Sequence, residues 1–369
     1  MRKSQKHIVI DARVRRASTG RYVDRLVENL QNMDVENRYT ILVEPDDDWQ
    51  MKNPNFKTVP CRFRQFSFNP LDQIAFAWQI HRLKPDLVHF TMTQQPVFYL
   101  GNIVTTTHDL TMLHHTRPSR FSPIVHRLGM VLYRFLIWWA HRKSKKIIVP
   151  SNFVARRLAK YHPFTKKKTK VIYEASDPPI NGKPEAVKGV SKPFIFHVGA
   201  PYPHKNIDRL IQAFALLKKD NPDLQLVLPG KMKDQFKRDF DSWINESLVK
   251  DSIVAPGFVS DHQLKWLYEN AETYVLPSLS EGFGLPGLEA MAHGCPVASS
   301  NATCLPEIYG DAVEYFDPIS TEEMANTIDK LINDQQLQED LRAKGKKQLQ
   351  KYSWRKMAEQ TIDIYNSLV

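Results

Sequence analysis

The stretch SEGFGLPGLE at residues 280–289 constrains the fold of this chain more than any other part of the sequence. The β-prone apolar run 273–277 precedes it and the helix-prone run 288–293 follows it, which predicts a strand, a glycine loop and a helix. Pro286 suits the first turn of a helix, where a missing N–H costs nothing. Backbone N–H groups at the positive end of that helix can bind a phosphate, and they belong to Phe283, Gly284 and Leu285.

Two carboxylates flank this predicted anion site. Glu281 precedes the glycine loop and Glu289 lies about one turn into the helix. Carboxylates accept hydrogen bonds from paired hydroxyl groups. A phosphate site between two such acceptors suits a ligand with a sugar, a diphosphate and a ribose in a row, which is a nucleotide sugar. The alternative is a surface glycine turn with two solvated glutamates.

The same stretch also contains the pattern G-x-G-x-x-G, at Gly282, Gly284 and Gly287. This pattern marks dinucleotide sites when it follows the first strand and an acidic residue lies about 20 positions further on. Glu307 fits that offset, but the motif lies late in the chain, and Glu281 would place a negative charge beside the pyrophosphate. We therefore disfavour an NAD site.

Length and composition predict a soluble protein of two domains. The chain has 369 residues, of which 42% are hydrophobic and 25% are charged. Three cysteines without metal spacing indicate thiols in a reducing cytosol, and no apolar run is long enough to cross a bilayer. We predict an N-terminal Rossmann-like acceptor domain, a linker, a Rossmann-like donor domain and a final helix that returns to the first domain, at residues 1–178, 179–192, 193–353 and 354–369.

Positive charge is concentrated in the first half of the chain. Residues 1–190 carry 32 Lys and Arg against 15 Asp and Glu, whereas residues 191–369 carry 19 against 25. This asymmetry indicates an anionic partner, namely a lipid surface, a lipid-phosphate acceptor or nucleic acid; the alternative is a solvated basic face. The apolar run 128–140 precedes the basic cluster 142–146. By default we expect it to form a buried helix, and the alternative is a helix docked on lipid.

The spacing of Glu281 and Glu289 resembles the signature of family 4 of the retaining glycosyltransferases, which have the GT-B fold of two doubly wound α/β domains. Other parts of the chain match in the same order. His108 and Asp109 follow a β-branched run, as an N-domain His-Asp pair does in the family. Lys205 with its following Asn matches a donor-domain loop. His204 stands where the family has arginine, and Gly20 alone remains of a glycine-rich loop after the first strand.

The resemblance implies roles for these residues. Lys205 and the amides of the glycine loop would stabilise the departing diphosphate, and Glu289 would hold the ribose. Glu281 would hold the sugar hydroxyls, and His108 would bind the sugar without acting as a general base. Further donor-binding candidates are Gly20, His204 and Lys231.

No cofactor or metal is expected by this resemblance. The D-x-D patterns at residues 46–48 and 239–241 are the only metal-like matches that we considered, and we expect them on solvated surface. Asp46 and Asp48 would be the ligands if a metal were required.

The loop at Lys205 resembles family members that use GDP-mannose, so the sequence favours a mannosyltransferase, with a UDP-linked donor as the alternative. The acceptor would be a glycan or a lipid-linked hydroxyl, and the enzyme would be cytoplasmic or peripheral on the inner face of the membrane. Two rival functions remain. One is a nucleic-acid-binding protein, although the basic clusters lack interleaved exposed aromatic residues. The other is a nucleotide-sugar epimerase or hydrolase, for which no water-activating base can be placed.

Overall fold

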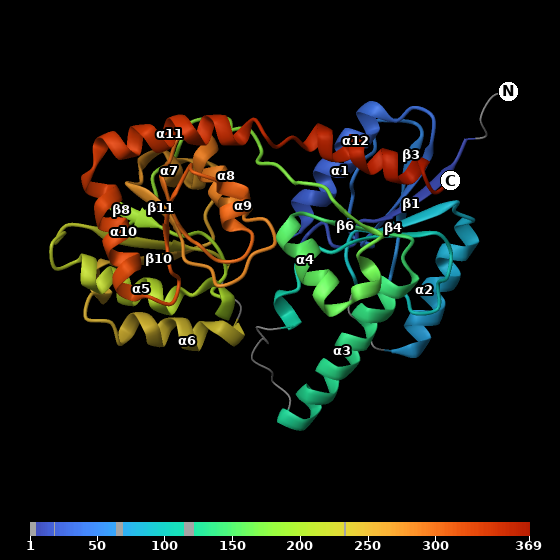
Figure 1. Cartoon of the computed structure of the whole chain (residues 1–369), viewed down its shortest axis with the longest axis horizontal. Coiled ribbons are helices and arrows are strands. Elements are labelled where there is room, and N and C mark those ends of the chain that lie inside the picture. Colours follow the sequence, from blue (N-terminus) through green and yellow to red (C-terminus); the bar gives the residue numbers. More distant parts are fainter. Residues whose placement is uncertain (1–4, 18, 64–68, 114–121, 232–233) are drawn as a thin grey trace. The chain divides into compact units, whose positions relative to one another are not determined.

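The computed structural model folds into two compact units (Figure 1). The structure describes residues 5–17, 19–63, 69–113, 122–231 and 234–369. Of these, unit 1 contains residues 5–110, 122–174 and 353–369, and unit 2 contains residues 111–113 and 175–352.

Unit 1 is built on a parallel sheet with strand order β3-β2-β1-β4-β5-β6-β7. Its central strands are β-branched and fully buried, as expected for a parallel sheet covered on both faces. The strands are β1 (His7–Asp11), β2 (Arg38–Val43), β3 (Phe56–Pro60), β4 (Leu87–Phe90), β5 (Ile103–Thr106), β6 (Lys146–Val149) and β7 (Thr169–Val171).

Helices complete unit 1, and the last helix of the chain is one of them. Tyr365 is buried in the unit, and α12 packs beside α1, which confirms the predicted return of the C-terminal helix (Figure 1). Ser122 and Ser151 cap α3 and α4 through their side-chain oxygens. The helices are α1 (Gly20–Met33), α2 (Pro70–Leu83), α3 (Pro123–Lys143), α4 (Asn152–Tyr161) and α12 (Trp354–Asn366).

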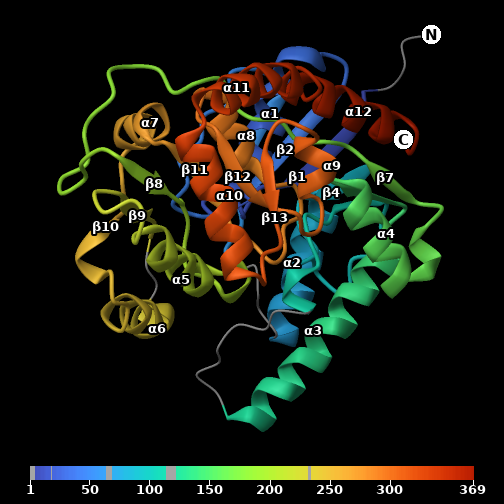
Figure 2. The same ribbon diagram turned by 60° about the vertical axis from the view of Figure 1, so that its left-hand side comes forward.

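The default expectation of a buried helix over residues 128–140 is wrong. This segment lies in α3, which extends away from the sheet of unit 1 (Figure 2). Leu128, Val131 and Phe135 are exposed, and only one side of the helix, with Ile137 and Ala140, is buried. The run is apolar because α3 carries apolar residues on both its core side and its outer side.

Unit 2 repeats the architecture with strand order β10-β9-β8-β11-β12-β13, all parallel. The strands are β8 (Phe194–Phe196), β9 (Gln225–Pro229), β10 (Ile253–Gly257), β11 (Thr273–Leu276), β12 (Val297–Ser300) and β13 (Glu314–Phe316). The helices are α5 (Ile207–Leu217), α6 (Asp234–Asn245), α7 (Asp261–Asn270), α8 (Leu285–Ala292), α9 (Leu305–Tyr309), α10 (Thr321–Asn333) and α11 (Gln335–Leu349).

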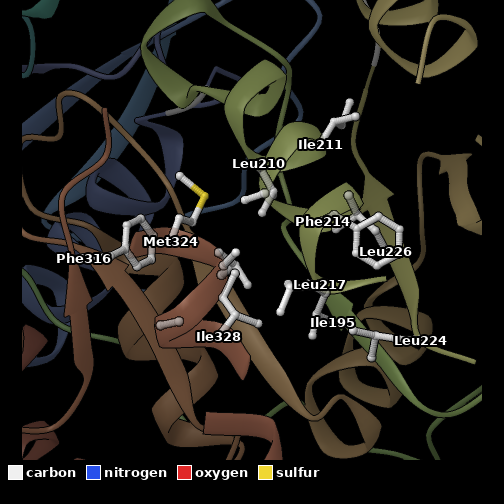
Figure 3. Packing of buried hydrophobic residues seen from close by; sticks show 14 of the residues in the cluster. Ile195, Leu210, Ile211, Phe214, Leu217, Leu224, Leu226, Phe316, Met324 and Ile328 are labelled. Carbon is white, nitrogen blue, oxygen red and sulfur yellow. The ribbon is translucent and has the colours of Figure 1, made fainter. Parts of the chain in front are cut away.

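A single apolar cluster joins α5 and α10 to the sheet of unit 2. Phe214 from α5 and Ile328 from α10 meet Leu226 of β9 and Ile195 of β8, and all four are fully buried (Figure 3). Burying each such side chain contributes about 1.5–3 kcal/mol. The cluster fixes α5, and the loop that precedes α5 carries Lys205.

Strand order reverses between β1 and β4 in unit 1 and between β8 and β11 in unit 2. In open parallel sheets, ligands bind beyond the carboxyl ends of the strands at such a switch point. Predicted site residues follow strands at or next to these switch points: His108 lies just beyond β5, the neighbour of β4, Lys205 follows β8, and Glu281 follows β11. The predicted GT-B-type α/β class is therefore confirmed by two doubly wound sheets.

Candidate functional site

In unit 2 the switch point brings Lys205 and Glu281 together. The Lys205 Nζ lies 2.7 Å from Glu281 Oε1, and both side chains are largely buried. Asn206 holds the lysine loop in place, because its buried amide nitrogen donates to the carbonyls of Pro277 and Pro318 at 3.0 and 2.7 Å. Its left-handed backbone (φ 61°) lets the chain turn from the loop directly into α5. The Lys205–Glu281 ion pair and the hydrogen bond from Asn206 to Pro277 therefore join the loop after β8 to the loop after β11.

Glu281 is held as a carboxylate. Its backbone N–H donates to Thr303 Oγ1 at 3.1 Å, which fixes the residue at the start of the glycine loop. Burial opposes its ionisation, but the charge and hydrogen bond of Lys205 outweigh burial, so the pKa of Glu281 is lowered. The pair therefore presents one fixed cation and one fixed anion side by side.

The glycine loop after β11 enters α8 as the sequence predicts. Gly284 adopts φ 88° just before the helix, and a Cβ there would lie 2.5 Å from the Tyr309 hydroxyl. That hydroxyl donates to the carbonyl of Gly284. Pro286 occupies the first turn, and the N–H of Gly287 donates to the carbonyl of Gly284 at 3.2 Å. Tyr309 therefore packs against Gly284 and fixes the conformation of the loop, which leads into the N-terminus of α8.

Glu289 lies one turn into α8 and is partly exposed. Its Oε2 accepts a hydrogen bond from the Tyr268 hydroxyl at 3.2 Å, and the Tyr268 ring stacks on His293 at 5.0 Å. A tyrosine donor leaves the carboxylate charged and fixes its orientation. A carboxylate is a group that only accepts hydrogen bonds, with about four lone-pair sites on its two oxygens.

His204 and Lys231, the other predicted donor-binding residues of unit 2, lie on loops at the same edge of the sheet. The His204 ring stacks on Tyr202 at 5.7 Å, and its carbonyl accepts from the N–H of Leu279 at 2.7 Å. Lys231 is exposed and its Nζ lies 5.1 Å from the ring centroid of Phe258. A Cβ on the preceding residue, Gly230, would lie 2.3 Å from the carbonyl of Gly199, so the two loops touch through their backbones.

The sequence did not identify His197, which lies just beyond β8. Its Nδ1 is 2.9 Å from the carbonyl of Val275 and must donate to it, which leaves Nε2 as a buried acceptor. Burial, followed by the charge of Lys205, lowers the pKa of His197 to about 4, so the ring is neutral at pH 7. A buried neutral acceptor beside the ion pair adds polarity without adding charge.

In unit 1 the predicted residue His108 is held between two acceptors. Its Nδ1 lies 3.0 Å from Glu174 Oε1, and its Nε2 lies 3.0 Å from the carbonyl oxygen of Thr91. Thr91 and Glu174 follow β4 and β7, so three strand ends contribute to this cluster. A carbonyl and a carboxylate both need a donor, and His108 can satisfy both only as a doubly protonated ring.

Electrostatics agrees with this geometry. Burial disfavours a charged ring, but the hydrogen bond and the charge of Glu174 outweigh burial, so the pKa of His108 is raised. With both nitrogens donating, His108 is a fixed cation and has no lone pair with which to take a proton. That His108 binds the sugar without acting as a general base stays a prediction.

A buried chain of hydrogen bonds supports the His108 ring from behind. The Tyr22 ring meets it edge to face at 4.8 Å, and the Tyr22 hydroxyl lies 2.9 Å from Thr106 Oγ1. His89 Nε2 bonds the same Thr106 oxygen at 2.8 Å, and His89 Nδ1 bonds the hydroxyl of Tyr365 on α12 at 2.6 Å. The C-terminal helix therefore helps to position the site of unit 1.

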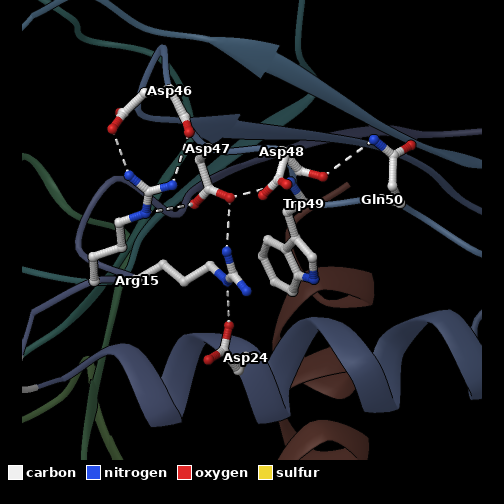
Figure 4. A network of polar contacts seen from close by, with 8 residues as sticks. Arg15, Asp24, Asp46, Asp47, Asp48, Trp49 and Gln50 are labelled. Carbon is white, nitrogen blue, oxygen red and sulfur yellow. Dashed lines mark hydrogen bonds and ion pairs between the residues drawn. The ribbon is translucent and has the colours of Figure 1, made fainter.

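The loop after β1, which ends at the predicted residue Gly20, is fastened by arginines (Figure 4). Arg15 bonds Asp24 at 2.6 Å and Asp47 at 2.7 Å, and its guanidinium lies 4.4 Å from the ring centroid of Trp49. A Cβ on Gly20 would lie 1.6 Å from the carbonyl of Arg15, so the loop closes tightly on the start of α1. Ion pairs thus stabilise the loop in this chain.

These arginines also use the carboxylates of the first D-x-D match. Asp46 Oδ2 lies 2.6 Å from Nη1 of Arg16, the next residue in the chain after Arg15. Asp46 and Asp48 are both exposed, as expected. In the second match, Asp241 pairs with Lys237 at 2.7 Å on the outer side of α6. Within the described parts of the chain, no group of three or more His, Cys, Asp and Glu side chains is placed to hold a metal ion.

Sequence reasoning missed Glu174, Tyr22, His89 and Tyr365. Each acts through a contact with a residue distant in the chain, such as the 66 positions between His108 and Glu174. The only available signal for Glu174 was a carboxylate directly after the strand-like run at residues 171–173.

The two halves of the chain match two family descriptions. Residues 19–178 match Glycosyltransferase Family 4, and residues 182–348 match Glycosyl transferases group 1. O-antigen chain mannosyltransferase B of Escherichia coli is 36% identical over 181 residues, which are 47% of this chain and 46% of that protein. The matched segment therefore spans less than half of that relative.

Solved structures share the fold over nearly the whole chain. Sucrose-phosphate synthase from Thermosynechococcus elongatus superposes with a TM-score of 0.78 at 19% identity, covering 99% of each chain. Anabaena Alr3699/HepE, in complex with UDP and glucose, gives a TM-score of 0.74 at 18% identity, covering 98% of this chain and all of that one. With a family 4 domain followed by a group 1 domain, this chain belongs to the GT-B glycosyltransferases.

Proposed function

We propose that the protein transfers mannose from GDP-mannose to a hydroxyl of a glycan or a lipid-linked acceptor, with retention of the anomeric configuration and without a metal. The observation that carries this proposal is the Lys205–Glu281 ion pair at 2.7 Å, set at the loop that leads into α8, with Glu289 one turn further on. A cation, a helix N-terminus and two carboxylates are the groups that a sugar diphosphate needs.

The proposed chemistry follows from the charges of these groups. Breaking the bond between the sugar C1 and the phosphate leaves a negative diphosphate, and a preorganised cation stabilises that charge in the transition state. Lys205 and the N-terminus of α8 supply it. Glu281 accepts from sugar hydroxyls, and its charge favours the positive sugar carbon.

The donor is the first thing to test. A mannosyltransferase is among the relatives, and the solved structure of Anabaena Alr3699/HepE contains UDP and glucose, so the two donors to compare first are GDP-mannose and UDP-glucose. Hydrolysis and transfer should be screened across GDP-linked and UDP-linked sugars, with NMR of the anomeric proton to establish retention. Preferential turnover of UDP-glucose would overturn the GDP-mannose proposal and leave the site assignment standing.

Glu289→Gln should weaken binding of the donor nucleotide at least roughly tenfold. The amide keeps the shape of the side chain but loses the charge that strengthens its hydrogen bonds to two ribose hydroxyls, each worth about 1.5–3 kcal/mol. Calorimetric titration with GDP measures this change. Glu339→Gln, on the exposed side of α11, is the matched control. Unchanged affinity in Glu289→Gln would remove Glu289 from the site.

Chelation should leave turnover intact. Lys205 and the helix N-terminus neutralise the diphosphate in this proposal, so no divalent ion is needed. Turnover should be measured with and without EDTA. Abolition by EDTA, followed by rescue with Mn²⁺ or Mg²⁺, would contradict the proposal and direct attention to Asp46 and Asp48.

A further inference from the structure

One side of α3 is a row of apolar side chains that are exposed among the described residues of unit 1. Its side chains recur at intervals of three and four residues, which places them on one face of the helix. They are 37–73% exposed, and they are Ile124, Val125, Leu128, Val131, Leu132, Phe135 and Trp138. An unbroken face of this kind marks an interaction site rather than scattered surface residues.

The opposite side of α3 fixes the helix firmly to unit 1. Ile137 and Ala140 are buried, and the indole N–H of Trp139 donates to the carbonyl of Val97 at 2.9 Å. Lys143 Nζ donates to the carbonyls of Pro96 and Tyr99. The exposed face is therefore held in a defined orientation.

Unit 1 carries further exposed apolar side chains on α2 and on the loop around Val97. Gln73 on α2 accepts from the N–H of Val97 at 3.0 Å, so the loop around Val97 links α2 and α3. Exposed apolar side chains from α2 and this loop are Leu71, Ile74, Trp78, Phe98 and Leu100. We call the seven residues of α3 and these five the α2–α3 apolar surface.

Positive charge accompanies this surface. Helix α3 contains no Asp or Glu, and its exposed basic residues include Arg127, Arg134 and Arg142. On α2, the Arg82 guanidinium lies 4.6 Å from the ring centroid of Trp78. A partner of this surface must therefore offer apolar volume and negative charge together.

An anionic bilayer offers both, and the other partners do not. A second copy of the chain would bring two basic helices together without an acidic residue on α3 to neutralise them. Nucleic acid would pair with the arginines but leave the apolar side chains without a partner. Within the part of the chain that the structure describes, no helix has the length and apolarity to span a bilayer. Helix α3 therefore fits the pattern of a helix that lies in the plane of the membrane interface.

We propose that the α2–α3 apolar surface docks on an anionic lipid bilayer, with the apolar side chains of α3 inserted among the lipids and its arginines on the headgroups. The purpose of docking, which is to bring the enzyme to a lipid-linked acceptor, rests on the proposed function. The docking itself rests only on the surface.

Co-sedimentation with vesicles tests the proposal. We expect binding to vesicles of phosphatidylcholine and phosphatidylglycerol and much weaker binding to phosphatidylcholine alone. High salt should reduce the binding without abolishing it, since salt screens the arginines but not the inserted side chains. Equal binding to both kinds of vesicle, or no binding to either, would overturn the proposal.

Variants separate insertion from charge. Leu128→Asp with Phe135→Asp should lower the vesicle partition coefficient at least roughly tenfold per substitution. Val35→Asp, at an apolar residue that is 71% exposed elsewhere in unit 1, is the matched control and should bind as the parent does. Arg127→Gln with Arg134→Gln should reduce the preference for anionic vesicles about fivefold per residue.

Further outcomes distinguish the rival partners and the two proposals. Light scattering that shows self-association of the parent, lost in Leu128→Asp with Phe135→Asp, would assign the surface to a second copy and overturn lipid docking. Stronger retention on duplex DNA than on anionic vesicles at matched salt would overturn it too. GDP affinity and donor turnover, measured on the same variants with a water-soluble acceptor, should be unchanged. A variant that loses vesicle binding but keeps its GDP affinity and donor turnover therefore tests docking independently of the proposed function.

Discussion

Replacing Lys205 by methionine should lower turnover by about a hundredfold or more. The ammonium group is the only side-chain cation that unit 2 brings within 4.0 Å of Glu281 among the described residues. Removing one preorganised donor from a developing anion costs about 10²–10³ in rate. Methionine keeps the length and packing of the side chain but carries no charge. The single-turnover rate with saturating donor is the measurement.

Lys205→Met should also destabilise the fold, because it leaves Glu281 charged, largely buried and without its partner. Breaking a buried pair costs about 3–5 kcal/mol at full burial, and less here, where 18% and 13% of the two side chains are exposed. The double variant Lys205→Met with Glu281→Gln removes both charges and should recover most of this stability. Its turnover should stay low. If turnover returned together with stability, Lys205 would be a structural residue only.

The fold could be predicted from local patterns. Central strands such as β1 and β5 are short β-branched runs, and a helix such as α1 has a regular apolar face, so the α/β class follows from periodicity. The entry into α8 followed from Gly284 and Pro286, because glycine and proline restrict the backbone locally.

The part of the site in unit 2 could be predicted for a similar reason. Lys205, Glu281 and Glu289 lie next to the loops that follow β8 and β11, and the ends of neighbouring parallel strands meet at one edge of a sheet. The pairing of Lys205 with Glu281, however, joins residues 76 positions apart, and no local pattern encodes it. The sequence predicted that these residues lie at one edge of the sheet of unit 2, but it did not predict the ion pair.

The support of His108 could not be predicted. Glu174 and Tyr365 contribute only through contacts made after the sheet has formed, and each looks like an ordinary residue in its own segment. The orientation of α3 was hidden for a different reason. Its composition is apolar on two sides, and hydropathy alone does not tell an exposed apolar side from a buried one.

Glu174→Gln should lower the pKa of His108 and reduce turnover about tenfold. The raised pKa depends on the carboxylate, and without it burial alone acts and disfavours the charged ring. The lost charge-assisted hydrogen bond is worth about 1.5–3 kcal/mol. NMR titration of the imidazole measures the pKa. A parent ring that titrates at or below pH 6.5, the ordinary histidine value, would contradict the assignment of His108 as a cation.

The same pair predicts a pH dependence of stability. A group whose pKa is higher in the folded than in the unfolded chain stabilises the fold fully below its unfolded pKa, here about 6.5, and loses this contribution as the pH rises through the folded value. The difference in the free energy of unfolding between parent and Glu174→Gln should therefore shrink as the pH rises above 6.5.

A double-mutant cycle shows whether Glu174 acts through His108. In a His108→Gln background, Glu174→Gln should change neither turnover nor the pH dependence of stability, because the group that it positions is already absent. An undiminished effect of Glu174→Gln in that background would assign Glu174 a role of its own. The buried histidine His89, whose pKa burial lowers to about 3, titrates well below this range and does not mask the result.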